Sequence, residues 1–219
     1  MKKIVIIFFV GIIISILIYR IYHYKKTDIL IIGDSIATGD TVYGNSGVSF
    51  NLYLKDYLKN KNLGNYDTTY TKNNMTVKEF NYQFEENNEV NDKHLQNRIN
   101  EAEIIIIALG QDELISKSKI DYLKSNERKE FYKNYEILLT NLKSVSKGKI
   151  YIIGFYSNKI NQIDEIEQKL SKMAQKYISK YLKINSVLSK YDYFDNNNYH
   201  LNYKGHKKIF EVLKEQIRL

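Results

Sequence analysis

The chain has no cysteine, and this absence removes two classes of chemistry. Without a thiol among its 219 residues, neither a disulfide framework nor a thiolate metal site can form. Proline and tryptophan are also absent, while lysine, asparagine, isoleucine and tyrosine are abundant; this bias is typical of AT-rich coding sequence and indicates no particular task. Histidine and acidic residues form no cluster at metal-ligand spacing, so we expect no metal and no cofactor.

The sequence also lacks a basic stripe. The formal net charge is +8, but five of these charges lie before Asp28, the first acidic residue, which leaves a net charge of +3 for the rest of the chain. Between Asn126 and Lys190, lysines and glutamates are interspersed as on solvated helix faces. We therefore expect no nucleic-acid partner.

Charge is missing altogether from residues 4–19, which are nearly all Ile, Val, Leu or Phe. A helix of these 16 residues spans about 24 Å, so flanking basic side chains must snorkel, or Ile21 and Tyr22 must join the span. The next residues, "YRIYHYKK", include none of the small residues that signal-peptide cleavage requires. We expect an uncleaved anchor and linker over residues 1–26, a single pass through a bacterial cell membrane, and one domain over residues 27–219 on the outer side.

The rest of the chain alternates predicted strands with predicted helices. Apolar or β-rich runs predict strands at residues 28–32, 66–71, 102–110, 149–157 and 181–185. Helical spacing predicts helices at residues 46–61, 114–123, 126–145, 164–180 and 204–217, with weaker patches at 77–84 and 94–99. This order predicts an α/β domain with a parallel, doubly wound sheet of five strands.

Two polar turns follow two of the predicted strands. Gly-Asp-Ser at residues 33–35 ends the first strand, and Gly-Gln-Asp at residues 110–112 ends the strand "AEIIIIALG". Ligands of such sheets bind beyond the carboxyl ends of the strands, which lie at one edge. We therefore expect the two turns to contribute to one site.

Ser35 has two interpretations. Glycine and serine commonly end strands as turn residues, whereas a nucleophilic serine needs a base, and histidine suits that role best near neutral pH. Of the four histidines, His23 lies at the membrane boundary, His94 in an asparagine-rich region and His206 inside the closing helix. His200 lies in the loop before that helix, where a base can reach the same edge of the sheet.

The two ends of the domain resemble a known family. "IIGDSIATG" is similar to the first block of the SGNH/GDSL hydrolases, and "YHLNYKGHKKI" is similar to their last block. The resemblance spans residues 28–219 and implies a three-layer α/β/α fold. It also implies that Ser35 is the nucleophile and His200 the base.

The acid of this family stands three residues before the base, and here the chain departs from the pattern. That position holds Asn197, and the nearest carboxylate is Asp195. An amide in place of the carboxylate can favour the wrong histidine tautomer. Either Asp195 orients His200 through a longer loop, or Ser35 and His200 work without an acid; we favour Asp195.

The oxyanion positions depart as well. The third family block is Gly-x-Asn-Asp, whose asparagine donates to the oxyanion; here Gly110 matches but Asp112 replaces the asparagine. A carboxylate repels an oxyanion unless it is protonated, and Gln111 can supply the amide only if the turn shifts by one residue. Asn74 replaces the glycine of the second block, a mild change because asparagine tolerates the left-handed conformation. With Asp34, these residues complete the expected oxyanion and substrate-binding set.

Two functions follow from these motifs. The first is a membrane-anchored serine esterase that hydrolyses a small-molecule, glycan or lipid ester, such as an O-acetyl glycan or a lipid acyl ester, through an acyl-enzyme. The second is a degenerate domain of the same fold that binds an envelope ligand without turnover, as the substitutions at positions 112 and 197 would allow.

Overall fold

The structure is a computed structural model that describes residues 11–15, 27–39, 47–117, 125–157, 163–188, 191–195 and 200–218. At its centre is a five-stranded sheet of order β2-β1-β5-β6-β7, in which every pairing is parallel. Its strands are β1 (Thr27–Gly33), β2 (Gly64–Thr71), β5 (Ile104–Ala108), β6 (Lys149–Ile153) and β7 (Lys180–Leu182). The predicted parallel sheet of five strands is confirmed.

The central strands are buried on both faces. Residues 29–32 of β1 have no exposed surface, and all of β5 is buried. Leu30 and Ile32 pack into one hydrophobic core, while Ile29 and Ile31 pack into the other. Strands covered on both sides read as continuous apolar runs, which is why these two are so plain in the sequence.

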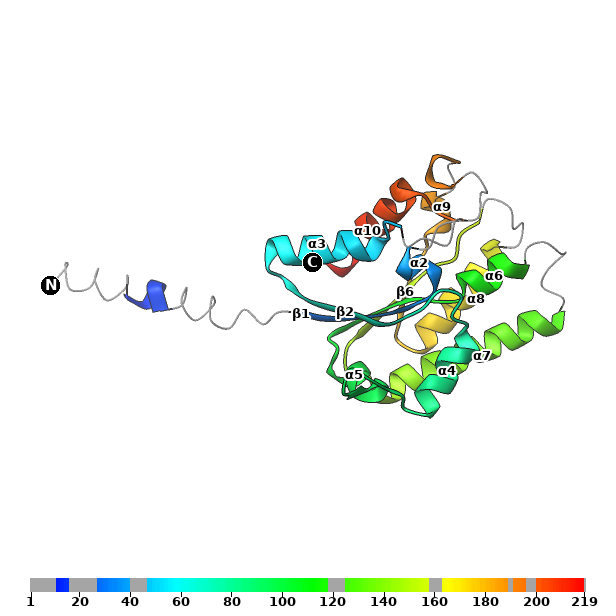
Figure 1. Cartoon of the computed structure of the whole chain (residues 1–219), viewed down its shortest axis with the longest axis horizontal. Helices are drawn as coiled ribbons and strands as arrows, with labels where there is room; N and C mark the ends of the chain where they lie inside the picture. The colour runs from blue at the N-terminus through cyan, green and yellow to red at the C-terminus, as the bar shows by residue number, and fades with distance from the viewer. Residues whose placement is uncertain are drawn as a thin grey trace.

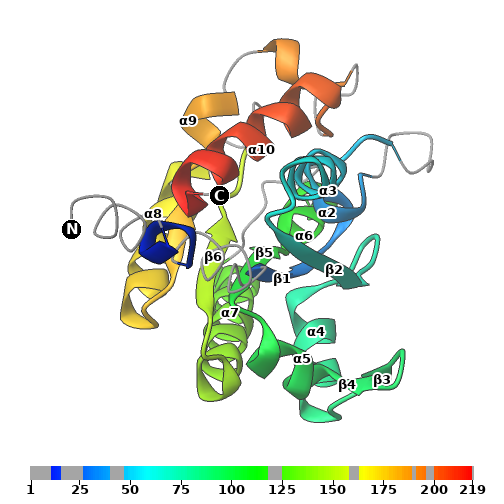
Figure 2. The same ribbon diagram turned by 90° about the vertical axis from the view of Figure 1, so that its left-hand side faces the viewer.

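Helices cover the two faces of the sheet (Figures 1 and 2). On one face lie α4 (Val77–Glu85), α5 (Leu95–Glu101), α7 (Ser125–Val145) and α8 (Ile163–Lys176). On the other lie α2 (Ser35–Thr38), α3 (Phe50–Lys61) and α10 (Tyr203–Ile217). Shorter elements are α6 (Gln111–Lys117), α9 (Asn185–Leu188), the 3-10 helix η1 (Tyr191–Tyr193), and a hairpin of β3 (Glu89–Val90) and β4 (Lys93–His94). The expected three-layer arrangement is confirmed.

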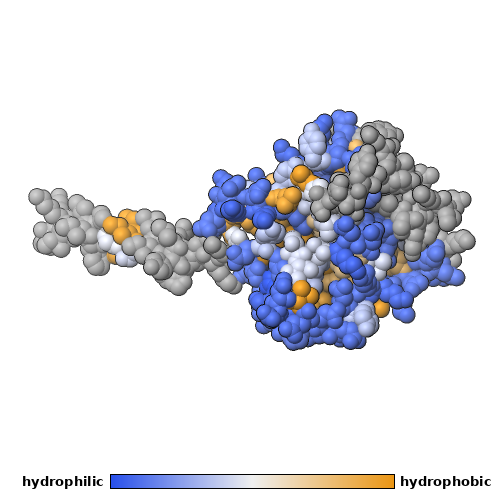
Figure 3. All heavy atoms as spheres, in the orientation of Figure 1, coloured by the Kyte–Doolittle hydropathy of each residue, from blue (hydrophilic) through white to orange (hydrophobic). Residues whose placement is uncertain are grey.

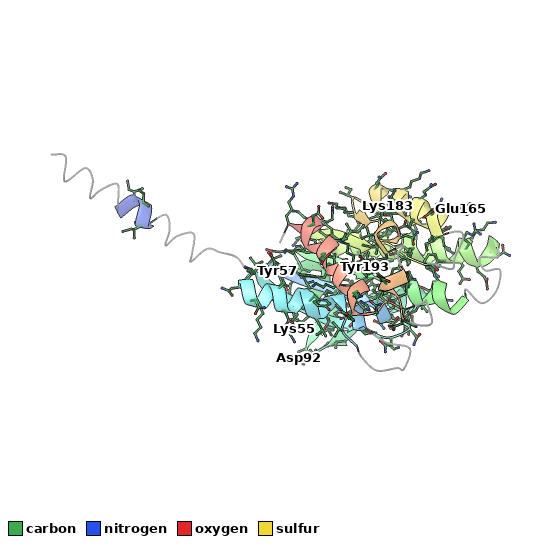
Figure 4. The ribbon with its side chains drawn as sticks, turned by 90° about the horizontal axis from the view of Figure 1, so that it is seen from above. Lys55, Tyr57, Asp92, Glu165, Lys183 and Tyr193 are labelled. Carbon is green, nitrogen blue, oxygen red and sulfur yellow. The ribbon has the colours of Figure 1, made fainter. Side chains whose placement is uncertain are left out.

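Helices α3 and α10 lie against each other in the outer layer, and α10 contains residues 203–209 of the last sequence block. Phe210 of α10 stacks on Tyr53 at 6.0 Å between ring centroids and meets Tyr57 edge-on at 5.8 Å. Figure 4 looks down on this layer, with Tyr57 of α3 and Tyr193 of η1 labelled. These aromatic contacts fix the end of the chain over the sheet.

Several predicted boundaries were wrong, for local reasons. The helix predicted to reach Lys180 ends at Lys176, because Ile178 takes a left-handed φ of 57° and Lys180 already begins β7. The helix predicted from residue 46 begins at Phe50, and the strand predicted to end at Asn185 ends at Leu182. The β3–β4 hairpin was missed because all four of its residues are exposed and polar patterning gives no signal there.

The predicted membrane anchor falls almost entirely outside the described residues. Within it, residues 11–15 are helical, and Ile12, Ile13 and Ile14 are exposed there, visible as hydrophobic surface in Figure 3. No helix in the part of the chain that the structure describes is both long enough and apolar enough to cross a membrane. The division into residues 1–26 and 27–219 stays a prediction.

Candidate active site

Asp34 ties together the two turns predicted to share a site. One carboxylate oxygen, Oδ2, accepts from the backbone N–H of Gly110 at 2.9 Å and of Asp112 at 3.2 Å, and Oδ1 accepts from Ile36 N–H at 3.2 Å. Its own N–H donates to Ala108 O at 2.9 Å. Burial, and then the charge of Asp112, raise the pKa of Asp34 well above its usual range, while the backbone N–H groups oppose this rise. With no exposed surface, Asp34 positions the turns instead of facing a substrate.

Gly33 allows strands β1 and β5 to come close at this point. A Cβ atom on Gly33 would lie 2.6 Å from Ala108 O and 2.5 Å from the Cβ of Ala37. These distances are too short for any Cβ atom, so only glycine fits immediately before Asp34 and Ser35. This close approach places Ser35, the first residue of α2, at the end of β1 and beside the turn that follows β5.

Asp112 contacts the expected nucleophile directly. Its Oδ2 accepts from the backbone N–H of Ser35 and from that of Asn74, each at 3.0 Å, and its Oδ1 accepts from the Ser35 hydroxyl. Asn74 has a left-handed φ of 58°, a conformation that asparagine tolerates. The two N–H groups therefore converge on one oxygen, and that oxygen belongs to Asp112.

Gln111 does not face Ser35. Its side-chain amide donates from Nε2 to Tyr156 O at 2.8 Å, and its Oε1 accepts from Tyr156 N–H at 3.2 Å. Only 1% of Gln111 is exposed, so both ends of the amide are committed to the backbone after β6. The shifted turn considered for Gln111 is not the one found. Tyr156 itself gave no sequence signal, because this contact uses only its backbone.

Gly110 makes the turn after β5 possible. Its φ is 103°, a conformation that side chains rarely adopt, and a Cβ atom there would also lie 3.1 Å from the Phe131 ring. The adjoining carboxylate, Glu113, accepts from Val77 N–H at 2.9 Å and so joins this turn to the start of α4. Glu113 was not among the expected site residues, and it holds the scaffold around Asp112.

His200 lies next to an antiparallel pairing of residues 194 and 201, which packs against Tyr156, beyond the end of β6. Asp195 N–H donates to His200 O at 2.9 Å, and Leu201 pairs with Phe194 in an isolated bridge. The Phe194 ring meets the Tyr156 ring edge-on at 6.0 Å. Through Tyr156 and its bonds to Gln111, the His200 segment is connected to the turn that carries Asp112. The approach of the His200 ring to Ser35 stays a prediction.

Asp195 lies within electrostatic reach of His200. Burial raises the pKa of the Asp195 carboxyl, and the charge of His200 opposes that rise. Asn197, the alternative at the acid position, lies outside the described residues. No group of three or more metal-ligating side chains occurs among the residues that the structure places.

Comparisons with known proteins identify the fold. No family model matches the sequence, and no curated protein matches it. Among solved structures, AlinE4, "a SGNH-hydrolase family esterase", superposes with a TM-score of 0.57 at 17% identity, over 89% of this chain and 96% of that one. The chain has the SGNH-hydrolase fold.

Other solved structures share this fold. A catalytic mutant of the acetylxylan esterase Axe2 from Geobacillus stearothermophilus has a TM-score of 0.65 at 16% identity, over 90% of this chain and 97% of that one. TesA has a TM-score of 0.65 at 11% identity, over 88% and 98%. These likenesses extend over nearly the whole of each structure, so the resemblance drawn from the two end blocks holds for the fold of the entire domain.

Proposed function

We propose that this chain is a serine esterase, with Ser35 as nucleophile and His200 as general base. The observation that carries the proposal is the convergence of the Ser35 and Asn74 N–H groups on one oxygen, each at 3.0 Å, beside the Ser35 hydroxyl. Two backbone donors aimed at one point next to a hydroxyl can stabilise the oxyanion that forms when that hydroxyl attacks a carbonyl. The esterases among the solved structures with this fold support the same reaction.

The reaction follows from these groups. Ser35 Oγ attacks the ester carbonyl carbon while its proton passes to His200, and the carbonyl oxygen becomes an oxyanion between the two N–H groups. His200 then gives the proton to the departing alcohol, which leaves an acyl-Ser35. Water, deprotonated by His200, attacks the acyl group, and the carboxylic acid departs as Ser35 regains its proton.

The substrate class follows from location and from the neighbours of the fold. We propose that residues 4–22 anchor the chain in the cell membrane as a single pass, with the domain on the outer side. An ester within reach is then an O-acetyl group of an envelope glycan or the acyl ester of a lipid. The likeness to an acetylxylan esterase supports the glycan ester, and the likeness to a lipase/acylhydrolase from Enterococcus faecalis supports the lipid ester.

A fluorophosphonate probe tests the nucleophile, because only an activated serine reacts with it. We expect labelling of the full-length protein at Ser35, and its loss in Ser35→Ala and His200→Ala. Hydrolysis of p-nitrophenyl acetate is expected to fall in parallel. Labelling that survives in Ser35→Ala, or no labelling of a folded wild-type chain, would contradict the esterase.

One observation favours a second function, a binding domain without turnover: the Asp112 carboxylate stands where an ester oxygen has to bind. In that case an envelope ligand would bind elsewhere on the domain, and no probe labelling would occur. The same experiment therefore separates the two functions.

The acid is tested by a pair of variants. If Asp195 orients His200, Asp195→Asn lowers turnover by a factor on the order of 10³ to 10⁴, because the wrong tautomer is favoured and the imidazolium loses its counter-charge. Asn197→Ala is the matched control and is expected to cost little. A silent Asp195→Asn together with a more active Asn197→Asp would assign the acid position to residue 197.

A further inference from the structure

Among the site residues that the structure describes, Asp112 is the one whose side chain occupies the place of a reactant. We propose that its carboxylate is an internal ligand of the oxyanion hole, which mimics a bound carboxylate product and has to leave before an ester can bind. The inference rests on the proposed esterase function only for the claim that the oxyanion hole serves catalysis. Occupancy of the hole by an anion can be tested without any turnover.

The contacts of the carboxylate match those expected of a product acid. One oxygen lies 3.0 Å from both the Ser35 and the Asn74 N atoms, as an oxyanion would, and the other accepts from Ser35 Oγ, as an acid just released from that serine would. Both N–H groups that would bind the ester oxygen, and the hydroxyl that would attack the ester, are therefore engaged by Asp112.

The hole is held in shape by contacts that do not involve the Asp112 side chain. Asp34 caps α2 by accepting from Ile36 N–H, which fixes the direction of the Ser35 N–H. The Asn74 loop is held by Lys72 N–H donating to Gly33 O at 3.0 Å and by the hydrogen bond between Thr38 and Asn73. The two donors thus stay in place when the carboxylate leaves.

The backbone of Asp112 is anchored separately from its side chain. Its N–H donates to Asp34 at 3.2 Å, and Gly110 at the start of the same turn donates to the same carboxylate. Asp112 is 8% exposed, whereas Asp34 has no exposed surface. Rotation of the Asp112 side chain would therefore vacate the hole without breaking the backbone hydrogen bonds of the turn.

The contact between Asp112 and the Ser35 hydroxyl has a second interpretation, in which Asp112 itself takes the serine proton as the base. The two interpretations predict opposite effects of removing the carboxylate. An internal ligand competes with substrate, so its removal speeds hydrolysis. A base is needed for attack, so its removal slows hydrolysis.

The first experiment compares turnover of p-nitrophenyl acetate by the full-length wild type, Asp112→Ala and Asp112→Asn. Loss of a single oxyanion donor costs about 10² to 10³ in kcat in a serine hydrolase, so freeing two donors is expected to raise kcat/KM of Asp112→Ala by a factor on the order of 10². Asp112→Asn keeps the side-chain size and is expected to rise as well, which preserves the comparison if the alanine variant fails to fold. A fall in kcat/KM in the folded variants overturns the proposal.

The second experiment measures binding of sodium acetate by thermal unfolding, against sodium chloride at equal ionic strength. A ligand that binds only the folded state raises the unfolding midpoint. We expect saturable stabilisation of Asp112→Ala by acetate and none of the wild type, whose hole is filled. Glu85→Gln, which removes an exposed carboxylate of α4 and leaves Asp112 in place, is the control and is expected to behave as wild type.

The two experiments separate failure of this inference from failure of the esterase. If Asp112→Ala binds acetate while no variant hydrolyses an ester or reacts with a fluorophosphonate, the internal ligand stands and the esterase falls. If the wild type hydrolyses esters while acetate stabilises Asp112→Ala no more than it stabilises the wild type, the esterase stands and the internal ligand is overturned.

Discussion

At the scale of single residues, Glu167 of α8 makes stability depend on pH in an unusual direction. Burial raises the pKa of its carboxyl to about 7, helped by the charge of Asp164 and opposed by the backbone N–H of Asn185 and by Lys183. The folded chain therefore holds a proton that the unfolded chain has lost between about pH 4.5 and 7. The free energy of unfolding must fall as the pH rises through this range.

Replacing Glu167 with glutamine removes this loss. We expect Glu167→Gln to be more stable than the wild type at pH 8 by on the order of 2 kcal/mol, because a neutral amide avoids the cost of burying a charge. At pH 4 the two proteins are expected to be nearly equal. Urea unfolding at both pH values measures the difference, and an equal effect at pH 4 and pH 8 would exclude titration of Glu167 as the cause.

His206 makes stability depend on pH in the opposite direction. Burial, and then the charge of nearby His200, lower its pKa to about 4, and its Nδ1 has no hydrogen-bond partner. Between about pH 4 and 6.5 the unfolded chain binds a proton that the folded chain does not, so stability is lost as the pH falls. His206→Gln is expected to be insensitive to pH on this account, whatever its absolute stability. Unfolding free energies at pH 5 and pH 7 test this. The free energy of unfolding of the wild type minus that of the variant must be lower at pH 5 than at pH 7.

For single residues, the sequence predicts least where the chain departs from the family motif, as at Asp112. The position of Ser35 after β1 could be predicted because a short motif ends a plain strand, and the left-handed φ of Asn74 is compatible with the sequence because asparagine tolerates that conformation. The sequence showed that an aspartate replaces the motif asparagine at position 112. It did not show that the Asp112 side chain accepts from the Ser35 N–H. That contact joins residues 77 positions apart and depends on how β1 and β5 are registered.

At the scale of elements, Arg98 fastens α5 to the sheet. Its Nε donates to Asp67 of β2 at 2.7 Å, and its Nη1 donates to Asp28 of β1 at 3.2 Å and to Glu101 at 3.3 Å. The Arg98 side chain is only 7% exposed, while that of Glu101 is 49% exposed. The two sheet carboxylates therefore depend on Arg98, and Glu101 depends on it far less.

Removing this side chain is expected to destabilise the domain. Arg98→Met leaves two half-buried carboxylates without their partner, and we expect it to lower the free energy of unfolding by about 1 to 3 kcal/mol. Glu101→Gln is the control and is expected to change it by less than about 0.5 kcal/mol. Urea unfolding at pH 7 compares them, and an equal effect of the two variants would contradict the role of Arg98.

Elements buried on both faces could be predicted, and short exposed ones could not. The apolar runs of β1 and β5 predict strands covered on both faces of a sheet. The long amphipathic pattern of α7 predicts a helix. The end of α8 depends instead on one left-handed residue, Ile178, which no propensity favours. The β3–β4 hairpin has two residues per strand, too few for a periodic pattern.

At the scale of the whole molecule, the proposed anchor sets where the domain works. We expect the full-length protein to sediment with membranes and to resist extraction at high pH, because residues 4–19 carry no charge and are nearly all apolar. Protease added to intact cells is expected to reach the domain. A mature chain that begins near Thr27, or full-length protein wholly in the soluble fraction, would show that the segment is no anchor.

The hydrogen bonds that Asp34 accepts from Gly110 and Asp112 give the site a place in the folding order. The proposed nucleophile Ser35 and the Asn74 donor follow the neighbouring strands β1 and β2, but the hydrogen bonds of Asp34 to the Gly110 turn can form only once β1 has paired with β5. Contacts between distant segments carry a high loop-closure cost and form slowly. Recovery of Ser35 reactivity during refolding should therefore report completion of the central strand pair, well after local helices such as α7 have formed.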